Sequence, residues 1–126
     1  MKKIIIASDS FKGSVSSIEV ADSAEKAVHT VFPGCEVVKI PVADGGEGTT
    51  EVLVYAMKGK MVSCKVHDPL MHIISARYGI SGDGETAVIE MASASGLPLV
   101  PENKRNPLLT TSYGTGELIK DALEKG

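Results

Sequence analysis

Three polar segments that contain glycine carry most of the side chains able to do chemistry. They combine carboxylates, hydroxyls, one lysine and one arginine with glycines that let a ligand approach the backbone. In chain order, the candidate residues are Asp9, Ser10, Lys12, Gly13 and Ser14; Asp44, Gly45, Gly46 and Glu47; and Arg105, Thr111, Ser112, Gly114, Thr115 and Gly116. Hydroxyls and helix N-termini bind anions, and Lys and Arg neutralise them. The pattern therefore predicts binding of small anions.

The first segment lies between a β-branched apolar run and a helical pattern. Lys12 supplies positive charge, Gly13 lets the backbone approach a ligand, and the N-terminus of the following helix favours an anion. The phosphate-binding pattern GxxxxGK[ST] is absent. The alternative interpretation is a solvated loop between strand and helix, in which Ser16 or Ser17 acts as an ordinary helix cap.

The second segment, Asp44–Gly48, places two carboxylates and three glycines before another helical pattern. A carboxylate in this position, with Asp44 as the candidate, is able to hold Mg²⁺ through water or to accept the proton of a substrate hydroxyl. The alternative is a turn followed by a helix start with favourable acidic charge. The sequence contains neither HExxH nor an EF-hand loop, so no metal site made of protein ligands alone is predicted.

The third segment has the highest density of anion-binding groups. Four hydroxyl-bearing residues, Thr110–Tyr113, precede the Gly-x-Gly of residues 114–116 at a helix start. Upstream, Arg105 has the planar guanidinium that grips a carboxylate or phosphate with two parallel hydrogen bonds. The alternative is a rigid helix cap that binds no ligand.

The elements that position these segments are predicted from hydrophobic periodicity. Apolar runs indicate strands at residues 4–7 and 36–40, and apolar residues spaced by three and four indicate a helix between them. Pro33–Gly34 ends that helix. A second helix is expected at about residues 49–57, with Gly59 after its end. The order strand, helix, strand is the start of an α/β fold.

The pattern changes near residue 60. Residues 60–67, 73–80 and 86–91 are extended runs separated by turns, and Ser81–Gly84 is a hairpin signal. These runs predict an antiparallel meander. The residue 110–116 segment then leads into a last helix. We therefore expect one domain to begin in residues 1–59 and another in residues 60–126.

Composition excludes several classes of partner. The 126 residues carry a formal net charge of −3 and only 4% aromatic residues. Nucleic acids and anionic membranes require a basic face, and base stacking requires aromatic side chains, so neither partner is predicted. No apolar run approaches the roughly 18 residues that span a bilayer, and the first apolar run is too short for a signal peptide. A cytoplasmic protein is expected.

Four motifs resemble motifs of the bacterial type of the ATP-dependent glycerate kinase family, and they follow one another in the same order as in that family. The motifs are Ser8–Ser14, Pro41–Thr49, Val88–Leu97, and Arg105–Pro107 followed by Gly114–Ile119. The resemblance covers essentially all 126 residues. Its mildest departure is Ser8, where family members often carry proline before the aspartate.

The resemblance implies a two-domain α/β kinase with a cleft between the domains, ATP and Mg²⁺ as cofactors, and D-glycerate as substrate. Its first domain, begun by residues 1–59, would be Rossmann-like (flavodoxin-type). The antiparallel segment would belong to the second α/β domain. The resemblance also implies a chain about three times as long, with the first domain completed by later sequence. The 126 residues alone would then lack a complete site.

Residue chemistry and motif position together give hypotheses for individual roles. Asp44 is the candidate general base or the group that orients the metal, and Lys12 would neutralise phosphate oxygens. Arg105 would hold the glycerate carboxylate, assisted by Ser112 and the backbone of residues 114–116. The sequence does not rank Asp9 against Asp44. Two other functions stay open: a non-catalytic module that binds small anions, and a structural module that associates into a homo-oligomer.

Overall fold

The computed structural model describes residues 3–11 and 13–125 of the chain. These residues form two compact units, Met1–Val52 and Leu53–Gly126. Each unit contains its own β-sheet, two-stranded in the first and three-stranded in the second.

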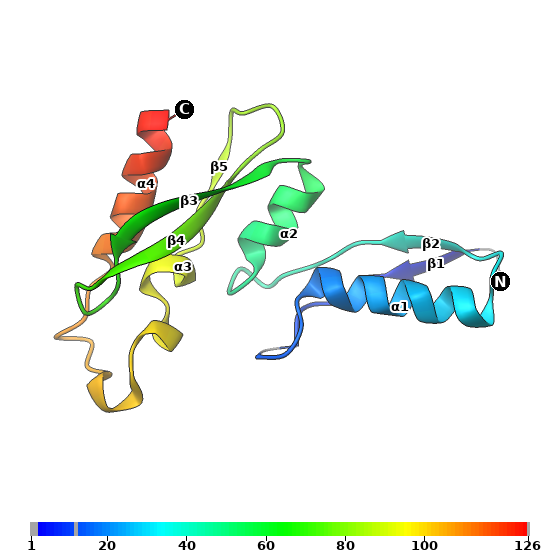
Figure 1. Ribbon diagram of the computed structural model, residues 1–126, viewed down its shortest axis with the longest axis horizontal. Coiled ribbons are helices and arrows are strands. Elements are labelled where there is room, and N and C mark those ends of the chain that lie inside the picture. The colour runs from blue at the N-terminus through cyan, green and yellow to red at the C-terminus, as the bar shows by residue number, and fades with distance from the viewer. Residues whose placement is uncertain (1–2, 12, 126) are drawn as a thin grey trace. The chain divides into compact units, whose positions relative to one another are not determined.

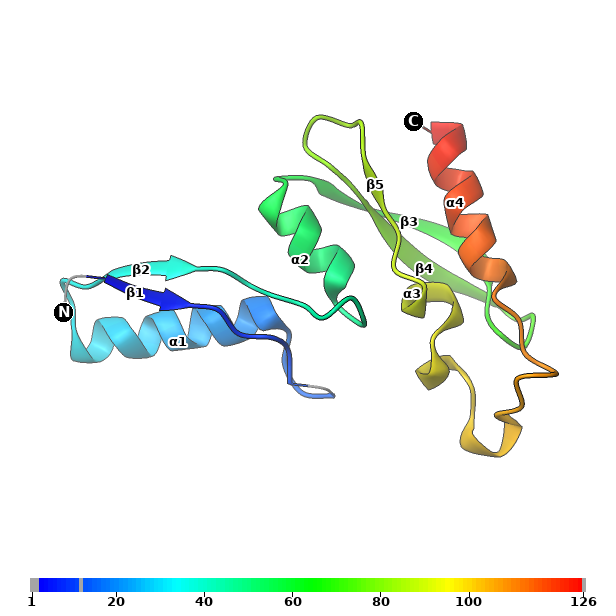
Figure 2. The same cartoon turned by 180° about the vertical axis from the view of Figure 1, so that it is seen from behind.

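The first unit is built on two parallel strands joined by a helix. Strand β1 (Lys3–Ile6) pairs in register with β2 (Glu36–Lys39), and α1 (Ser17–Val31) forms the crossover. Figures 1 and 2 both show α1 lying along the strand pair. Parallel strands need such a crossover, and the predicted order of strand, helix and strand is confirmed.

Helix α1 begins where the sequence predicts because Ser16 and Glu19 form a capping box. The Ser16 hydroxyl accepts the Glu19 amide at 3.3 Å, and the Glu19 carboxylate accepts the Ser16 amide at 2.8 Å. The bond from the Ser16 amide, and after it a bond from the Ser16 hydroxyl to the same carboxylate, lower the pKa of Glu19 below its ordinary value. The helix ends at Val31, just before Pro33–Gly34.

One face of the β1–β2 pair packs against α1. Ala21 of the helix is buried, and the Lys39 ammonium of β2 lies 2.8 Å from Asp22 and 2.7 Å from Glu25 of α1. Hydrogen bonds to these two carboxylates raise the pKa of Lys39. On β1, Ile5 is 61% exposed. The first unit therefore buries apolar surface on one side of its sheet only.

Helix α2 (Thr49–Ala56) contains the division between the two units. After it, Lys58 takes a left-handed backbone conformation, with φ at 51°. Gly59 helps to end the helix, as predicted, because its amide donates to the Val54 carbonyl at 2.8 Å, but the left-handed conformation falls on Lys58. A Cβ on Gly59 would lie 2.1 Å from the Ile80 carbonyl oxygen, so the residue is needed for a close approach to the sheet.

The second unit is built on an antiparallel sheet in the order β3–β4–β5. Strands β3 (Lys60–His67) and β4 (Ile73–Ile80) pair along their whole length and match the predicted bounds. Strand β5 covers only Ala87–Val88, whereas the sequence predicts a strand over residues 86–91. The β4 amide of Arg77 donates instead to the Ser93 hydroxyl at 2.9 Å. A side chain of α3 thus takes the β4 amide that the remainder of the predicted strand would have paired with.

Two helices cover one face of this sheet. They are α3 (Ala92–Ser95) and α4 (Tyr113–Lys125), and two short 3-10 helices at Leu97–Leu99 and Glu102–Lys104 lie between them. Figure 1 shows α4 running beside β3. The core that they enclose consists of Val66, Ala76, Tyr78, Ala94, Leu118 and Ala122. None of the described helices is long and apolar enough to cross a bilayer.

Candidate functional site

The first two polar segments leave the same edge of the first unit's sheet. The pairing of β1 with β2 continues past the strand ends, because the Ile40 amide donates to Ile6 and the Val42 amide donates to Ser8. Asp9 and Asp44 follow directly. The carboxyl ends of parallel strands are where α/β folds bind ligands. The structure therefore brings these two predicted segments together at that edge.

The Asp9 segment forms a tight turn before α1. The Asp9 carboxylate accepts the Ser10 amide at 2.6 Å, and the Ser14 amide donates to the Phe11 carbonyl at 2.9 Å. Gly13 and Ser14 are exposed. Lys12, the predicted phosphate-neutralising residue, lies outside the described residues.

The α1 N-terminus, which the sequence predicts as an anion site, carries a carboxylate of its own. Glu19 of the capping box places a carboxylate on the Ser16 amide. An anion from outside would meet this negative charge at the helix start. The Asp9 segment therefore offers an anion its own backbone amides and hydroxyls, and the N-terminus of α1 adds little to anion binding.

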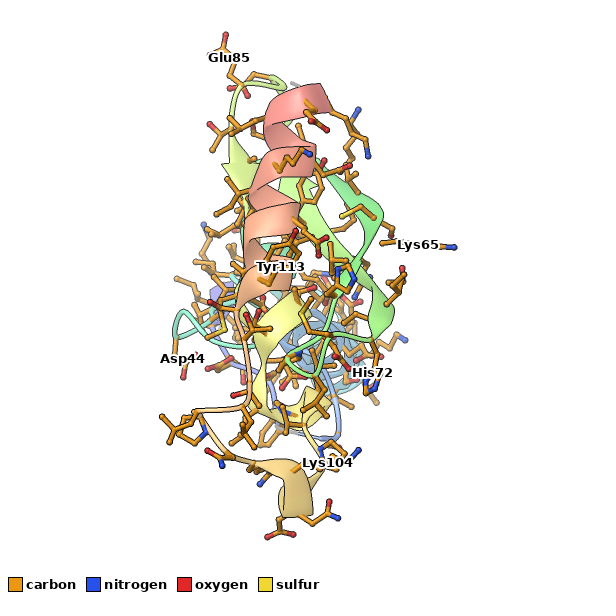
Figure 3. The ribbon with its side chains drawn as sticks, turned by 90° about the vertical axis from the view of Figure 1, so that its left-hand side faces the viewer. Asp44, Lys65, His72, Glu85, Lys104 and Tyr113 are labelled. Atoms are coloured by element: carbon orange, nitrogen blue, oxygen red, sulfur yellow. The ribbon has the colours of Figure 1, made fainter. Side chains whose placement is uncertain are left out.

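The Asp44 segment is a glycine turn that ends at the N-terminus of α2. Gly45 and Gly48 have φ values of 96° and 90°, a region that residues with a Cβ rarely adopt. The Asp44 Oδ1 accepts the Gly46 amide at 2.9 Å. Asp44 and Glu47 are exposed, and Figure 3 shows Asp44 on this turn. No hydrogen bond from the described residues reaches the Asp44 Oδ2, which leaves that oxygen available.

The first residue of α2 adds a second polar group to this turn. The Thr49 Oγ1 is buried and has no hydrogen-bond partner among the described residues. A buried hydroxyl without a partner is uncommon in folded proteins. The Thr49 amide itself donates to the Gly46 carbonyl at 3.2 Å. The Asp44 turn thus presents an exposed carboxylate, and the start of α2 contains a buried hydroxyl that lacks a partner among the described residues.

The third segment lies in the second unit, and bonds to the rest of that unit hold it in place. The Arg105 Nε donates to the Val100 carbonyl at 3.2 Å, and the Thr111 amide donates to the Pro69 carbonyl at 3.0 Å. Arg105 is exposed and keeps its terminal guanidinium nitrogens for other partners. Ser112 is also exposed.

The first turn of α4 contains both predicted glycines, Gly114 and Gly116. The Thr111 hydroxyl accepts the Tyr113 amide at 3.1 Å and so caps the helix, and the Thr115 hydroxyl bonds to Ser95 at 2.7 Å. A Cβ on Gly114 would lie 1.9 Å from the His67 carbonyl oxygen, whereas one on Gly116 would meet nothing within 4 Å. Gly114 therefore serves packing, and Gly116 has open space beside it.

Two histidine–carboxylate pairs in the second unit were not foreseen. The His67 Nδ1 lies 3.0 Å from both carboxylate oxygens of Glu117, and the His72 Nδ1 lies 3.1 Å from Asp68. The first pair joins residues 50 positions apart, a separation that carries no local sequence signal. The second has a separation of four, which could have been noticed. Among the described residues, no group of three or more acidic, His or Cys side chains is placed to hold a metal ion.

Comparison with known proteins places these segments in a family. The chain is 58% identical to a glycerate kinase of Haemophilus influenzae, over 98% of the chain and 33% of that protein. It is 56% identical to a glycerate 2-kinase of Escherichia coli, over 98% of the chain and 32% of that protein. The chain thus spans about a third of the length of these relatives.

A solved structure agrees with this comparison. The crystal structure of a protein assigned as glycerate kinase 2 from Salmonella typhimurium LT2 superposes with a TM-score of 0.82 at 51% identity, over 98% of this chain and 33% of that one. The family model for glycerate kinases matches residues 4–126, which includes all three polar segments. The chain therefore belongs to the glycerate kinase family.

Proposed function

We propose that the gene product carrying these residues is an ATP-dependent glycerate kinase, which transfers the γ-phosphoryl group of ATP to D-glycerate. The products are phosphoglycerate and ADP. The observation that carries the proposal is the 58% identity, over 98% of the chain, to a protein named glycerate kinase. The matched residues include the two turns that leave one edge of the β1–β2 sheet.

We assign the central role to Asp44. Phosphoryl transfer is catalysed mainly by positioning and by charge neutralisation. The Gly46 amide holds Oδ1 of Asp44, so Oδ2 is left to accept the proton of a glycerate hydroxyl or to bind a metal-bound water. Asp9 is the competing carboxylate, and its Oδ1 accepts the Ser10 amide in the same way.

The described residues fit Mg²⁺ that arrives with the nucleotide. Mg²⁺ in phosphoryl-transfer enzymes keeps several waters and takes one or two carboxylates plus substrate phosphates. Asp44 and Glu47 are exposed carboxylates on one turn, which suits that ligand set. When bound, the ion would neutralise charge on the transferring phosphate. Lys12 is assigned the same neutralising role from the protein side.

The third segment is assigned to the substrate carboxylate. Arg105 has free terminal nitrogens, Ser112 is exposed, and Gly116 leaves space for a ligand against the helix backbone. Thr111 and Thr115 are assigned to orient this segment, because their hydroxyls bond to the Tyr113 amide and to Ser95. Gly114 contributes through packing.

The architecture proposed for the whole enzyme follows the family. Residues 1–59 would begin a Rossmann-like, flavodoxin-type domain, and residues 60–126 would begin a second α/β domain. The parallel β1–β2 pair with its α1 crossover supports the first assignment. The enzyme would act in the cytoplasm, and association into a homo-oligomer remains part of the proposal.

The proposal is tested by measuring ADP release from ATP and D-glycerate with the gene product. We expect glycerate-dependent turnover, and we expect Asp44→Asn to lower kcat by roughly 100-fold or more, as for loss of a general base. Asp9→Asn tests the competing carboxylate, and a larger loss of kcat in this variant than in Asp44→Asn would transfer the role to Asp9. Binding of ATP or glycerate without turnover would instead support the non-catalytic anion-binding module.

The same assay identifies the acceptor hydroxyl. One relative is named a glycerate 2-kinase, so we expect 2-phosphoglycerate as the product. Phosphorus NMR of the reaction mixture distinguishes this isomer from 3-phosphoglycerate.

A further inference from the structure

The end of β3 and the first turn of α4 are fastened together by three residues, His67, Gly114 and Glu117, which we call the β3–α4 clasp. The Glu117 carboxylate accepts the His67 backbone amide at 2.7 Å and lies 3.0 Å from the ring Nδ1. Gly114 lies against the His67 carbonyl so closely that no side chain fits. The clasp therefore holds both the amide and the carbonyl of one strand residue.

The chemistry of the clasp fixes the tautomer of the imidazole. An ionised carboxylate only accepts hydrogen bonds, so the His67 Nδ1 must carry a proton. The bond from the His67 amide lowers the pKa of Glu117, which keeps it ionised at neutral pH. In the neutral ring the proton then sits on Nδ1, and Nε2 keeps its lone pair. The Tyr113 ring packs edge-on against this imidazole, with centroids 5.7 Å apart.

The clasp decides where the first turn of α4 lies. Figure 3 shows Tyr113 at the start of this helix. Among the described residues, no acceptor outside α4 receives the amides of Gly114 or Gly116. Neighbouring bonds from Thr111 to Pro69 and from Thr115 to Ser95 support the same segment. A shift of the clasp would therefore move Ser112 and Gly116, two of the groups assigned to substrate.

We propose that Glu117 is a positioning residue of the kinase: through His67 it sets the first turn of α4 at the place where the glycerate carboxylate binds. This inference rests on the proposed function. Glu117 does not touch the substrate, and its role is to hold the binding groups of the third segment at a fixed position relative to the end of β3.

Charge gives this proposal a sharp test, because electrostatics alone predicts the opposite result. Glu117 carries a negative charge on α4, and the first turn of the same helix is assigned to the glycerate carboxylate, which is also negative. If only charge mattered, removing it would strengthen glycerate binding. If positioning matters, removing it loosens the first turn and weakens binding. The sign of the change in KM therefore separates the two explanations.

The experiment is steady-state kinetics of the gene product carrying Glu117→Gln. We expect KM for glycerate to rise roughly tenfold, the scale of one charge-assisted hydrogen bond, with KM for ATP unchanged and kcat within about twofold. Asp121→Asn is the matched control. Asp121 lies one turn later on α4, its side chain is 25% exposed against 26% for Glu117, and it accepts the Tyr78 hydroxyl of β4 at 2.9 Å.

Substitutions of His67 give a second readout if Glu117→Gln fails to fold. His67→Asn keeps a donor near the position of Nδ1, so this variant should retain most of the wild-type affinity for glycerate. His67→Phe keeps only the ring, so its KM for glycerate should rise. The ring tautomer is measured independently of turnover by ¹⁵N NMR, with protonated Nδ1 expected in the wild type.

Several outcomes would overturn the positioning role. They are an unchanged or lower KM for glycerate in Glu117→Gln, an equal rise in Asp121→Asn, and a wild-type ring protonated on Nε2 alone. A wild-type protein without glycerate-dependent turnover contradicts the proposed function instead, and the NMR result then still decides whether the clasp exists.

Discussion

At the scale of single residues, Gly114 and Gly116 show how one sequence motif divides into two physical roles. The Gly-x-Gly pattern predicts two glycines that leave room for a ligand. Only Gly116 has that room, because Gly114 is pressed against the His67 carbonyl. The sequence gives no sign of the difference, since the strand that excludes a side chain at position 114 lies far away along the chain.

The different surroundings of the two glycines predict that alanine changes the stability in opposite directions at the two positions. Gly116→Ala meets no atom within 4 Å, and alanine favours a helix, so the variant should gain roughly 0.5–1 kcal/mol of stability. Its methyl group would enter the proposed glycerate space and raise KM. Gly114→Ala should lose roughly 1–3 kcal/mol or more because α4 must move away from β3.

Urea unfolding measures the two stabilities, and steady-state kinetics of the gene product measures KM. Equal destabilisation by the two substitutions would show that the first turn of α4 packs differently from the structure. A stable Gly116→Ala variant with unchanged KM would remove Gly116 from the substrate site.

The histidines show where residue-level prediction from sequence stops. His67 has no partner near it in sequence, and its partner Glu117 is reached only after the sheet and α4 have formed. Asp9 and Asp44 are different. Their position after two predicted parallel strands was enough to place them at one sheet edge.

At the scale of elements, the sequence predicts strands better where one face of the strand packs against the same helices along its whole length. Strands β3 and β4 match their predicted bounds because apolar residues face α3 and α4 throughout. The last predicted strand stops at Val88 because Ser93 satisfies the Arg77 amide. Periodicity has no means of detecting that a side chain competes with a strand for a backbone group.

The turn between β3 and β4 depends on one buried carboxylate, Asp68. It accepts the amides of Leu70 and His72 at 2.8 and 2.9 Å and pairs with the His72 ring. Burial raises the pKa of Asp68, but these hydrogen bonds outweigh it, so the net pKa lies below the ordinary value. The carboxylate form is therefore the one that stabilises the turn.

The lowered pKa of Asp68 predicts that the stability of the protein falls in acid. Because the folded pKa is below the unfolded one, Asp68 contributes its full stability above the ordinary aspartate pKa of about 4 and loses it as the pH falls through the lowered value. Asp68→Asn should be less stable than wild type at pH 7, and the gap should narrow below about pH 4. Urea midpoints measured for both proteins across this range test the prediction, and a gap that stays constant would contradict it.

At the scale of the whole molecule, the two units differ in how much core they possess. The second unit encloses a connected apolar cluster between its sheet and two helices. The first has two paired strands, one helix and an isoleucine that is 61% exposed on its sheet. The sequence predicts a change of character near residue 60, and the compact units divide at residues 52 and 53, inside α2. Periodicity detects the change from helix to strands, but it does not show which unit a continuous helix packs against.

This difference predicts unequal stability within the 126-residue chain. A two-stranded sheet with one covered face is marginal in water, whereas three strands packed on helices support independent folding. Amides of the second unit's core, such as Val66, Ala76 and Tyr78, should exchange with deuterium roughly 100-fold or more slowly than those of Ile6 and Val38 in the first. A shortened chain of residues 48–126 should keep the same slow amides, and one of residues 1–52 should show none. Equal protection of both sheets would mean that the units unfold as one, and loss of the slow amides in the 48–126 chain would mean that the second unit's core needs the first to form.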